Sequence, residues 1–121
     1  MYEVSRDDVF SASHHLRDYH GKCEAVHGHN WKVRLSVEGR ELGPGGMLVD
    51  FVVLKKVLAE VLDALDHKDL NVVPPFDVME PTAENLARHV FQEAAGRLDA
   101  PGRRVCRVQV WETDFSCATY Y

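Results

Sequence analysis

The chain has 121 residues, of which 45% are apolar and 27% charged, a balance that excludes a disordered or fibrous protein. Its 14 basic and 19 acidic residues give a net charge of −5, whereas a nucleic-acid-binding domain normally carries a basic face. No apolar run approaches the ~20 residues of a membrane span, and residues 1–8 carry charges where a signal peptide needs an apolar stretch. We therefore expect one cytoplasmic domain over residues 1–121, with no nucleic-acid partner and no membrane contact.

Two segments in the first third of the chain alternate apolar and polar residues and are predicted to form β-strands. Residues 2–12 contain Val4, Phe10 and Ala12 at even positions. In residues 29–38, the apolar side carries Trp31, Val33, Leu35 and Val37. The glycine-rich residues 39–46 indicate a turn, and we expect residues 47–51 to continue the sheet briefly.

Two helices are predicted next. The first follows Asp50, a suitable N-cap, and its apolar residues recur with a spacing of 3.6: Phe51, Leu54, Leu58, Val61, Leu62 and Leu65. The second follows Thr82 as its N-cap, has Glu84 near the positive end of the helix dipole, and ends before Pro101. Its apolar side consists of Leu86, Val90, Phe91, Ala94 and Leu98.

The last segment alternates again, which places Cys106, Val108 and Val110 on the predicted core face of a strand. The order strand, strand, helix, helix, strand, strand predicts an α+β domain: a four-stranded antiparallel sheet with two helices on one face. Because such a sheet has open edges, we expect several copies to assemble through them.

Histidine is concentrated near the first two strands, with five of the seven histidines between residues 14 and 29. His27 and His29 are two positions apart on a strand and therefore point to the same face. The first strand places His14 on its apolar face, in line with Phe10. Three imidazoles that leave one coordination position open are typical of a catalytic Zn²⁺ site, so we predict zinc here. The alternative is a turn with exposed histidines.

Cys23 lies four residues before His27 and admits three interpretations. It could be a fourth metal ligand, which would make the site closed and structural. It could instead be a nucleophile or general base, its thiolate favoured by nearby positive charge. A small buried side chain is the third interpretation, although the polar neighbours Lys22 and Glu24 argue against burial.

Asp66 directly precedes His67, just after the first predicted helix. A carboxylate beside an imidazole can orient the ring and raise its basicity. A histidine near a helix C-terminus is also favourable in its own right, and without other information helix termination is the simpler interpretation.

Glu112 continues the alternation of Val108 and Val110 and should lie at the far end of the same face. A carboxylate there needs a partner or a ligand, because an unpaired buried charge is costly. The edge of an amino-pyrimidine would provide suitable donors. The alternative is a strand that frays before Glu112 and leaves its side chain in water.

Five blocks of residues, taken in order and with their spacing, form a single pattern. They are Phe10-Ser11-Ala12-Ser13-His14, Cys23-x-x-x-His27-Gly28-His29-Asn30, Leu65-Asp66-His67-x-x-Leu70-Asn71, Pro81-Thr82-x-Glu84-Asn85 and Glu112-Thr113. Together they resemble the 6-pyruvoyl-tetrahydropterin synthase family. The resemblance implies the tunnelling fold, in which three subunits close a barrel and two trimers stack into a hexamer.

The resemblance also implies how the site is built. Zn²⁺ would be held by His14, His27 and His29. Proton transfer would fall to Cys23, Asp66 and His67. Glu112 and Thr82 would bind the substrate, 7,8-dihydroneopterin triphosphate, in a site between subunits.

The short spacing from Cys23 to His27 resembles that of bacterial 6-carboxytetrahydropterin synthases of queuosine biosynthesis, since the animal enzymes have a longer gap. The expected activity is therefore a zinc-dependent lyase that forms 6-carboxy-5,6,7,8-tetrahydropterin and releases triphosphate and acetaldehyde. Glu24 departs from this pattern, because a folate-linked bacterial branch has Glu there and lacks the cysteine. With both residues present, Glu24 would be a second catalytic base, and 6-hydroxymethyl-dihydropterin or the 6-pyruvoyl compound is the alternative product.

Overall fold

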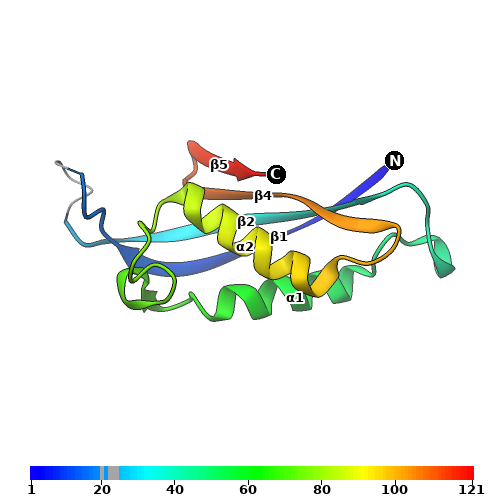
Figure 1. The fold of residues 1–121 in the computed structure, drawn as a ribbon, viewed down its shortest axis with the longest axis horizontal. Helices are drawn as coiled ribbons and strands as arrows, with labels where there is room; N and C mark the ends of the chain where they lie inside the picture. Colours follow the sequence, from blue (N-terminus) through cyan, green and yellow to red (C-terminus); the bar gives the residue numbers. More distant parts are fainter. Residues whose placement is uncertain (20, 22–24) are drawn as a thin grey trace.

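The computed structural model describes residues 1–19, 21 and 25–121 and has an α+β architecture (Figure 1). The strands are β1 (Tyr2–His14), β2 (His27–Gly39), β3 (Lys68–Asp69), β4 (Arg103–Thr113) and β5 (Ser116–Tyr120). The helices are α1 (Phe51–Asp63) and α2 (Ala83–Leu98), with short 3-10 turns η2 (Pro44–Gly46) and η3 (Leu70–Val72). Both long helices pack on the same face of the sheet (Figure 1).

The sheet has five strands in the order β3-β1-β2-β4-β5, so the predicted four-stranded sheet is one strand short. The four longer strands pair antiparallel, whereas β3 runs parallel to β1 through Ala12 and Ser13. A two-residue strand is too short to show alternation, which is why the sequence did not reveal it. Residues 47–51 do not extend the sheet, because the chain there leads directly into α1.

The core lies between the sheet and the two helices, as the apolar spacing predicted. The strands contribute Phe10, Ala12, Trp31, Val33, Leu35, Val37, Val105, Val108 and Val110, and the helices contribute Leu54, Leu58, Val61, Leu62, Leu86, Val90 and Leu98. Each large apolar side chain stabilises the fold by about 1.5–3 kcal/mol relative to exposure. His14 is in phase with this face of β1, so only 2% of it is exposed.

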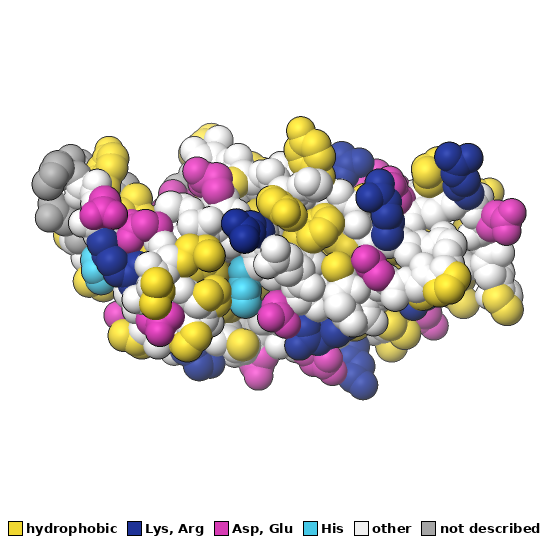
Figure 2. Space-filling model, in the orientation of Figure 1, with side chains coloured by type: hydrophobic (Ala, Val, Ile, Leu, Met, Phe, Trp, Pro, Cys, Tyr) yellow, Lys and Arg dark blue, Asp and Glu magenta, His cyan; other side chains and the backbone are white. Residues whose placement is uncertain are grey.

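Both predicted N-caps are confirmed. Asp50 accepts a hydrogen bond from the backbone N–H of Val52, and Thr82 accepts one from Asn85. Phe51 is the exception to the predicted apolar face, since it precedes the first turn packed on the sheet and is exposed. Neither α1 nor α2 is long and apolar enough to cross a bilayer. On the face seen in Figure 2, acidic and basic side chains are interspersed, as is typical of a solvated surface.

The prediction that Cys106 faces the core is wrong because β4 contains a β-bulge. The pairing of β2 with β4 shifts between Ser36, which is opposite Arg107, and Val37, which is opposite Val105. The extra residue reverses the alternation locally, as bulges do. Val105 therefore enters the core, while Cys106 is only half-buried. Burial still raises the pKa of its thiol.

Candidate metal centre

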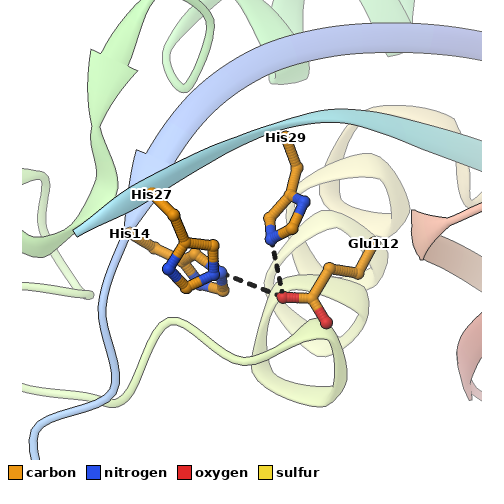
Figure 3. Close-up of side chains that lie close together, drawn as sticks. All are labelled: His14, His27, His29 and Glu112. Atoms are coloured by element: carbon orange, nitrogen blue, oxygen red, sulfur yellow. Dashed lines mark ion pairs between the residues drawn. The ribbon is translucent and has the colours of Figure 1, made fainter. Parts of the chain in front are cut away.

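Four side chains converge at one end of the sheet, on its helix-covered face: His14, His27, His29 and Glu112 (Figure 3). Each offers one ligand atom, and these atoms all lie within 4.8 Å of one another. The β-sheet register explains the grouping, because His14 at the end of β1 is paired with His27 at the start of β2. His29 follows two residues later on the same face. The three predicted zinc ligands are thus neighbours in the folded chain.

Glu112 joins the histidines from β4. Its Oε1 lies 3.0 Å from Nε2 of His14 and 3.1 Å from Nε2 of His29 (Figure 3). The alternation of β4 persists to this residue, so the side chain faces the imidazoles and only 32% of it is exposed. Of the two alternatives left open by the sequence, the structure therefore supports a partnered carboxylate. Sequence reasoning had considered Glu112 for substrate binding alone and did not include it among the metal ligands.

Backbone carbonyls fix the orientation of two rings. Nδ1 of His14 lies 2.8 Å from the carbonyl oxygen of Pro81, and Nδ1 of His27 lies 2.7 Å from that of Ala25. Because a carbonyl only accepts hydrogen bonds, each Nδ1 must carry the proton and donate it. Each neutral ring then presents an Nε2 lone pair. A ligand histidine held through its other nitrogen in this way is the usual arrangement in metal sites.

The contact between His14 and Glu112 is consequently one between two acceptors. Nε2 of His14 and Nε2 of His29 are both buried and form no aligned hydrogen bond within the part of the chain that the structure describes. A lone pair facing a carboxylate oxygen at 3.0 Å is favourable only when a cation or a proton lies between them. Three imidazoles and one carboxylate oxygen are a donor set that suits a divalent first-row metal. The residues present therefore fit a metal ion.

The electrostatic surroundings of His29 favour the neutral ring that a metal requires. Burial lowers its pKa below the ordinary value of 6.5. The negative charge of Glu112 opposes this effect, whereas the neighbouring rings of His14 and His27 add to it. The net direction is downward, so His29 is available as a ligand near neutral pH.

The Asp66–His67 pair lies elsewhere in the same chain. Asp66 Oδ1 accepts a hydrogen bond from the backbone N–H of Ser11 at 2.9 Å and lies 2.9 Å from Nδ1 of His67. The pair is tied to the edge of β1 rather than ending the helix, which closes at Asp63. His67 is exposed and borders an open depression together with Ser11, Ser13, Gly28 and Asn30.

The depression lies at the edge of the sheet where β3 pairs with β1, and His29 is also part of its lining. Ser11 and Asn30 alternate with the core residues of their strands and point away from the helices, whereas His14 and His29 point toward them. Asp66 and His67 are not among the converging donors, so, in the part of the chain that the structure describes, the predicted proton-transfer pair lies outside the candidate metal centre.

Asp66→Asn should lower the free energy of unfolding at neutral pH, and acidification should erase the difference. The hydrogen bond from Ser11 and then the contact with His67 lower the pKa of Asp66 below 3.8. A carboxyl whose pKa is depressed on folding stabilises the protein above the unfolded pKa and loses this effect as the pH falls through the folded pKa. Urea unfolding between pH 7 and pH 2.5 measures this. Asp77→Asn, at an exposed loop acid, is the control, and an equal pH dependence in both variants would contradict the prediction.

The remaining predicted residues lie as follows. The Thr82 hydroxyl caps α2, and Thr82 follows Pro81, whose carbonyl holds His14. Cys23 and Glu24 lie outside the described residues.

Arg17 is a residue that sequence reasoning missed. Its guanidinium donates hydrogen bonds to the carbonyl oxygens of Asn71, Phe76 and Met79, at 2.6–3.2 Å, and to the carboxylate of Glu80. It thereby ties the segment after β1 to the loop that precedes Pro81, the residue whose carbonyl oxygen accepts the hydrogen bond from His14. These contacts span more than 50 residues of sequence, so no local pattern could have revealed them.

Arg17→Met should lower the free energy of unfolding by about 1–3 kcal/mol, because hydrogen bonds from a charged donor are lost while their partly buried acceptors remain. Chemical denaturation measures the loss. Arg97→Met, which removes a surface pair with Glu93 on α2, should cost only about 0.3–0.5 kcal/mol. Equal losses in the two variants would show that Arg17 does not fasten the loop.

The five-stranded sheet, its two helices and the converging donors define an α+β domain with a candidate metal centre. The family model described as 6-pyruvoyl tetrahydropterin synthase matches residues 3–121. The chain belongs to this family.

Relatives in the family carry two activity names. The chain is 34% identical over 125 residues to 6-carboxy-5,6,7,8-tetrahydropterin synthase of Bacillus subtilis, covering 98% of this chain and 84% of that protein. It is 36% identical over 133 residues to human 6-pyruvoyl tetrahydrobiopterin synthase, covering 98% and 90%. Among solved structures, 6-pyruvoyl tetrahydropterin synthase of Caenorhabditis elegans superimposes with a TM-score of 0.88 at 32% identity, covering 98% of this chain and 94% of that one.

Proposed function

We propose that this protein is a zinc-dependent 6-carboxy-5,6,7,8-tetrahydropterin synthase of the queuosine branch. It would convert 7,8-dihydroneopterin triphosphate into the 6-carboxy pterin, with loss of triphosphate and acetaldehyde. The observation that carries the proposal is the convergence of three imidazoles and a carboxylate in a chain of this family. We further propose that residues 1–121 form one domain and that the protein is cytoplasmic.

The spacing of the chain supports the 6-carboxy branch over the 6-pyruvoyl branch. The alignment with the human relative is 133 positions long and the alignment with the Bacillus relative is 125 positions long, although each covers 98% of this chain. The human alignment therefore needs more inserted positions. This agrees with the short segment between Cys23 and His27.

His14, His27 and His29 would hold the zinc ion. A zinc ion bound there would act as a Lewis acid that stabilises negative charge on the oxygens of the substrate side chain. Glu112 would accept hydrogen bonds from the amino-pyrimidine edge of the pterin and so orient the ring, with Thr82 at the adjoining start of α2. Orientation of this kind places the side-chain carbons next to the groups that transfer protons.

Cys23, as a thiolate, would move protons at the side-chain carbons, with His67 as its acid–base partner and Asp66 orienting His67. Glu24 would be a second base that steers the cleavage. Because Asp66 and His67 lie at the edge of β1, outside the group of converging donors, they would act in a site shared with another copy of the chain. The edge strand β5 and the part of β1 that β3 leaves unpaired are suitable for pairing copies into a trimer, or a dimer of trimers.

The test is to incubate the zinc-loaded protein with 7,8-dihydroneopterin triphosphate and identify the products. Triphosphate with acetaldehyde and a 6-carboxy pterin is the expected result. Glycolaldehyde with 6-hydroxymethyl-dihydropterin would assign the protein to the folate branch, and a 6-pyruvoyl product without aldehyde would assign it to the 6-pyruvoyl branch. Tight pterin binding without any product would show a binding protein instead.

Cys23→Ala should abolish turnover and leave the zinc content unchanged, because the proposed role of the thiolate is proton transfer rather than metal binding. Product formation and metal analysis on the same preparation measure both effects. Cys106→Ala is the matched control, since Cys106 lies in the bulge of β4 and has no proposed role. If Cys23→Ala also loses its zinc, the cysteine is a ligand and this assignment is wrong.

A further inference from the structure

We propose that Glu112 is a replaceable fourth ligand of the metal. In the protein without substrate, its carboxylate would complete the donor set of the three histidines. A ring with adjacent N–H donors that enters the neighbouring cavity would then draw the carboxylate away and free a coordination position. The second step rests on the proposed pterin-binding function, whereas the first does not.

The first step follows from how close Glu112 lies to the other ligand atoms. One oxygen, Oε1, is within 3.1 Å of Nε2 of both His14 and His29, and both nitrogens are buried without an aligned hydrogen bond among the described residues. The ring of His14 already donates its Nδ1 proton to Pro81, so its Nε2 cannot also donate as a neutral ring. A carboxylate held in this position is arranged as a ligand rather than as a simple hydrogen-bond partner.

The second step follows from what else Glu112 borders. It is also part of the lining of a cavity of about 350 Å³ between the start of α2 and strand β5, together with Ala83, Glu84 and residues 116–119. In Figure 3, the second carboxylate oxygen points away from His14 and His29. Glu112 therefore lies between the metal donors and a cavity, and 32% of it is exposed to an entering ligand.

A carboxylate in this position cannot satisfy both partners fully. Two adjacent N–H donors of an amino-pyrimidine bind a carboxylate through both of its oxygens, which competes with metal coordination. Ring binding would therefore weaken the bond from Glu112 to the metal, and by linkage that bond would weaken ring binding by the same factor. The metal would keep four protein donors until the ring is bound, and it would become open to the substrate side chain only then.

Zinc affinity without any pterin tests the first step. Competition with a chromophoric chelator should show that Glu112→Gln binds Zn²⁺ at least about tenfold more weakly than the unmodified protein. Removing a residue that only hydrogen-bonds a metal ligand already lowers metal affinity by about this factor, and removing a ligand should cost at least as much. Glu84→Gln is the matched control, because Glu84 borders the same cavity but is not one of the converging donors, and it should stay within about twofold. Equal zinc affinity of Glu112→Gln and the unmodified protein would overturn the inference.

Cobalt spectroscopy tests the second step, because the visible bands of Co²⁺ respond to its ligands whereas Zn²⁺ is silent. Unsubstituted pterin, which lacks the reactive side chain, should shift the bands of the Co²⁺-loaded protein. The Co²⁺-loaded Glu112→Gln variant should differ before pterin is added and change no further. If pterin binds, as followed by its fluorescence, and leaves the bands of the unmodified protein unchanged, Glu112 is not replaceable and the inference is wrong. If pterin does not bind at all, the proposed function fails with the second step, while the zinc measurements still decide the first.

Discussion

His27→Ala is expected to abolish stoichiometric metal binding and leave the fold intact. His27 provides one of the converging ligand atoms, and its ring is oriented by the Ala25 carbonyl. Removing a residue that only orients a metal ligand typically lowers metal affinity about 10–100-fold, and removing a ligand itself should lower the affinity by more. The fold should survive because His27 is partly exposed at the start of β2, whereas His14 packs in the core. Metal content after dialysis, together with circular dichroism, measures both effects.

His89→Ala is the control for a lost imidazole. His89 lies on α2, partly buried against Phe76 and outside the converging group. We expect this variant to keep its metal. One metal ion per chain retained by His27→Ala would contradict the assignment of the centre, since two imidazoles and Glu112 would then suffice.

Trp31→Ala should cost about 3–5 kcal/mol of the free energy of unfolding, as large-to-small changes of buried aromatic residues do. Trp31 is fully buried, stacks on Phe10 with ring centroids 5.9 Å apart, and donates a hydrogen bond to the Ala12 carbonyl at 3.3 Å. Its ring also contacts those of His14 and His29 edge-on, at 4.9 and 5.3 Å. Metal affinity should therefore fall together with stability, which urea unfolding and zinc titration measure.

Trp111→Ala is the control for Trp31→Ala, because it removes a tryptophan that lies outside the core. Trp111 lies on the opposite face of the sheet, with Nζ of Lys32 4.7 Å from its ring centre. A cation–π contact at such a partly exposed site contributes about 0.5–1 kcal/mol. We expect a correspondingly small loss of stability and unchanged zinc affinity. Equal losses in the two variants would contradict the view that Trp31 supports the metal centre.

The elements with long periodic patterns were predictable because their signal is local. The alternation of β2 placed Trp31 and His29 on one face, and the caps Asp50 and Thr82 set where α1 and α2 begin. The same local reasoning failed at Cys106, because a bulge depends on how β4 pairs with β2. It also missed β3, since two residues have no period.

The sequence by itself determined that three histidines lie on core-facing positions of adjacent strands, because strand alternation sets the direction of every second side chain. Only the tertiary structure decided that Glu112 joins them and that Asp66 and His67 lie at the edge of β1, outside this group. These placements depend on which strands become neighbours. That choice is made by packing and backbone pairing between segments more than 50 residues apart, which leave no periodic trace in the chain.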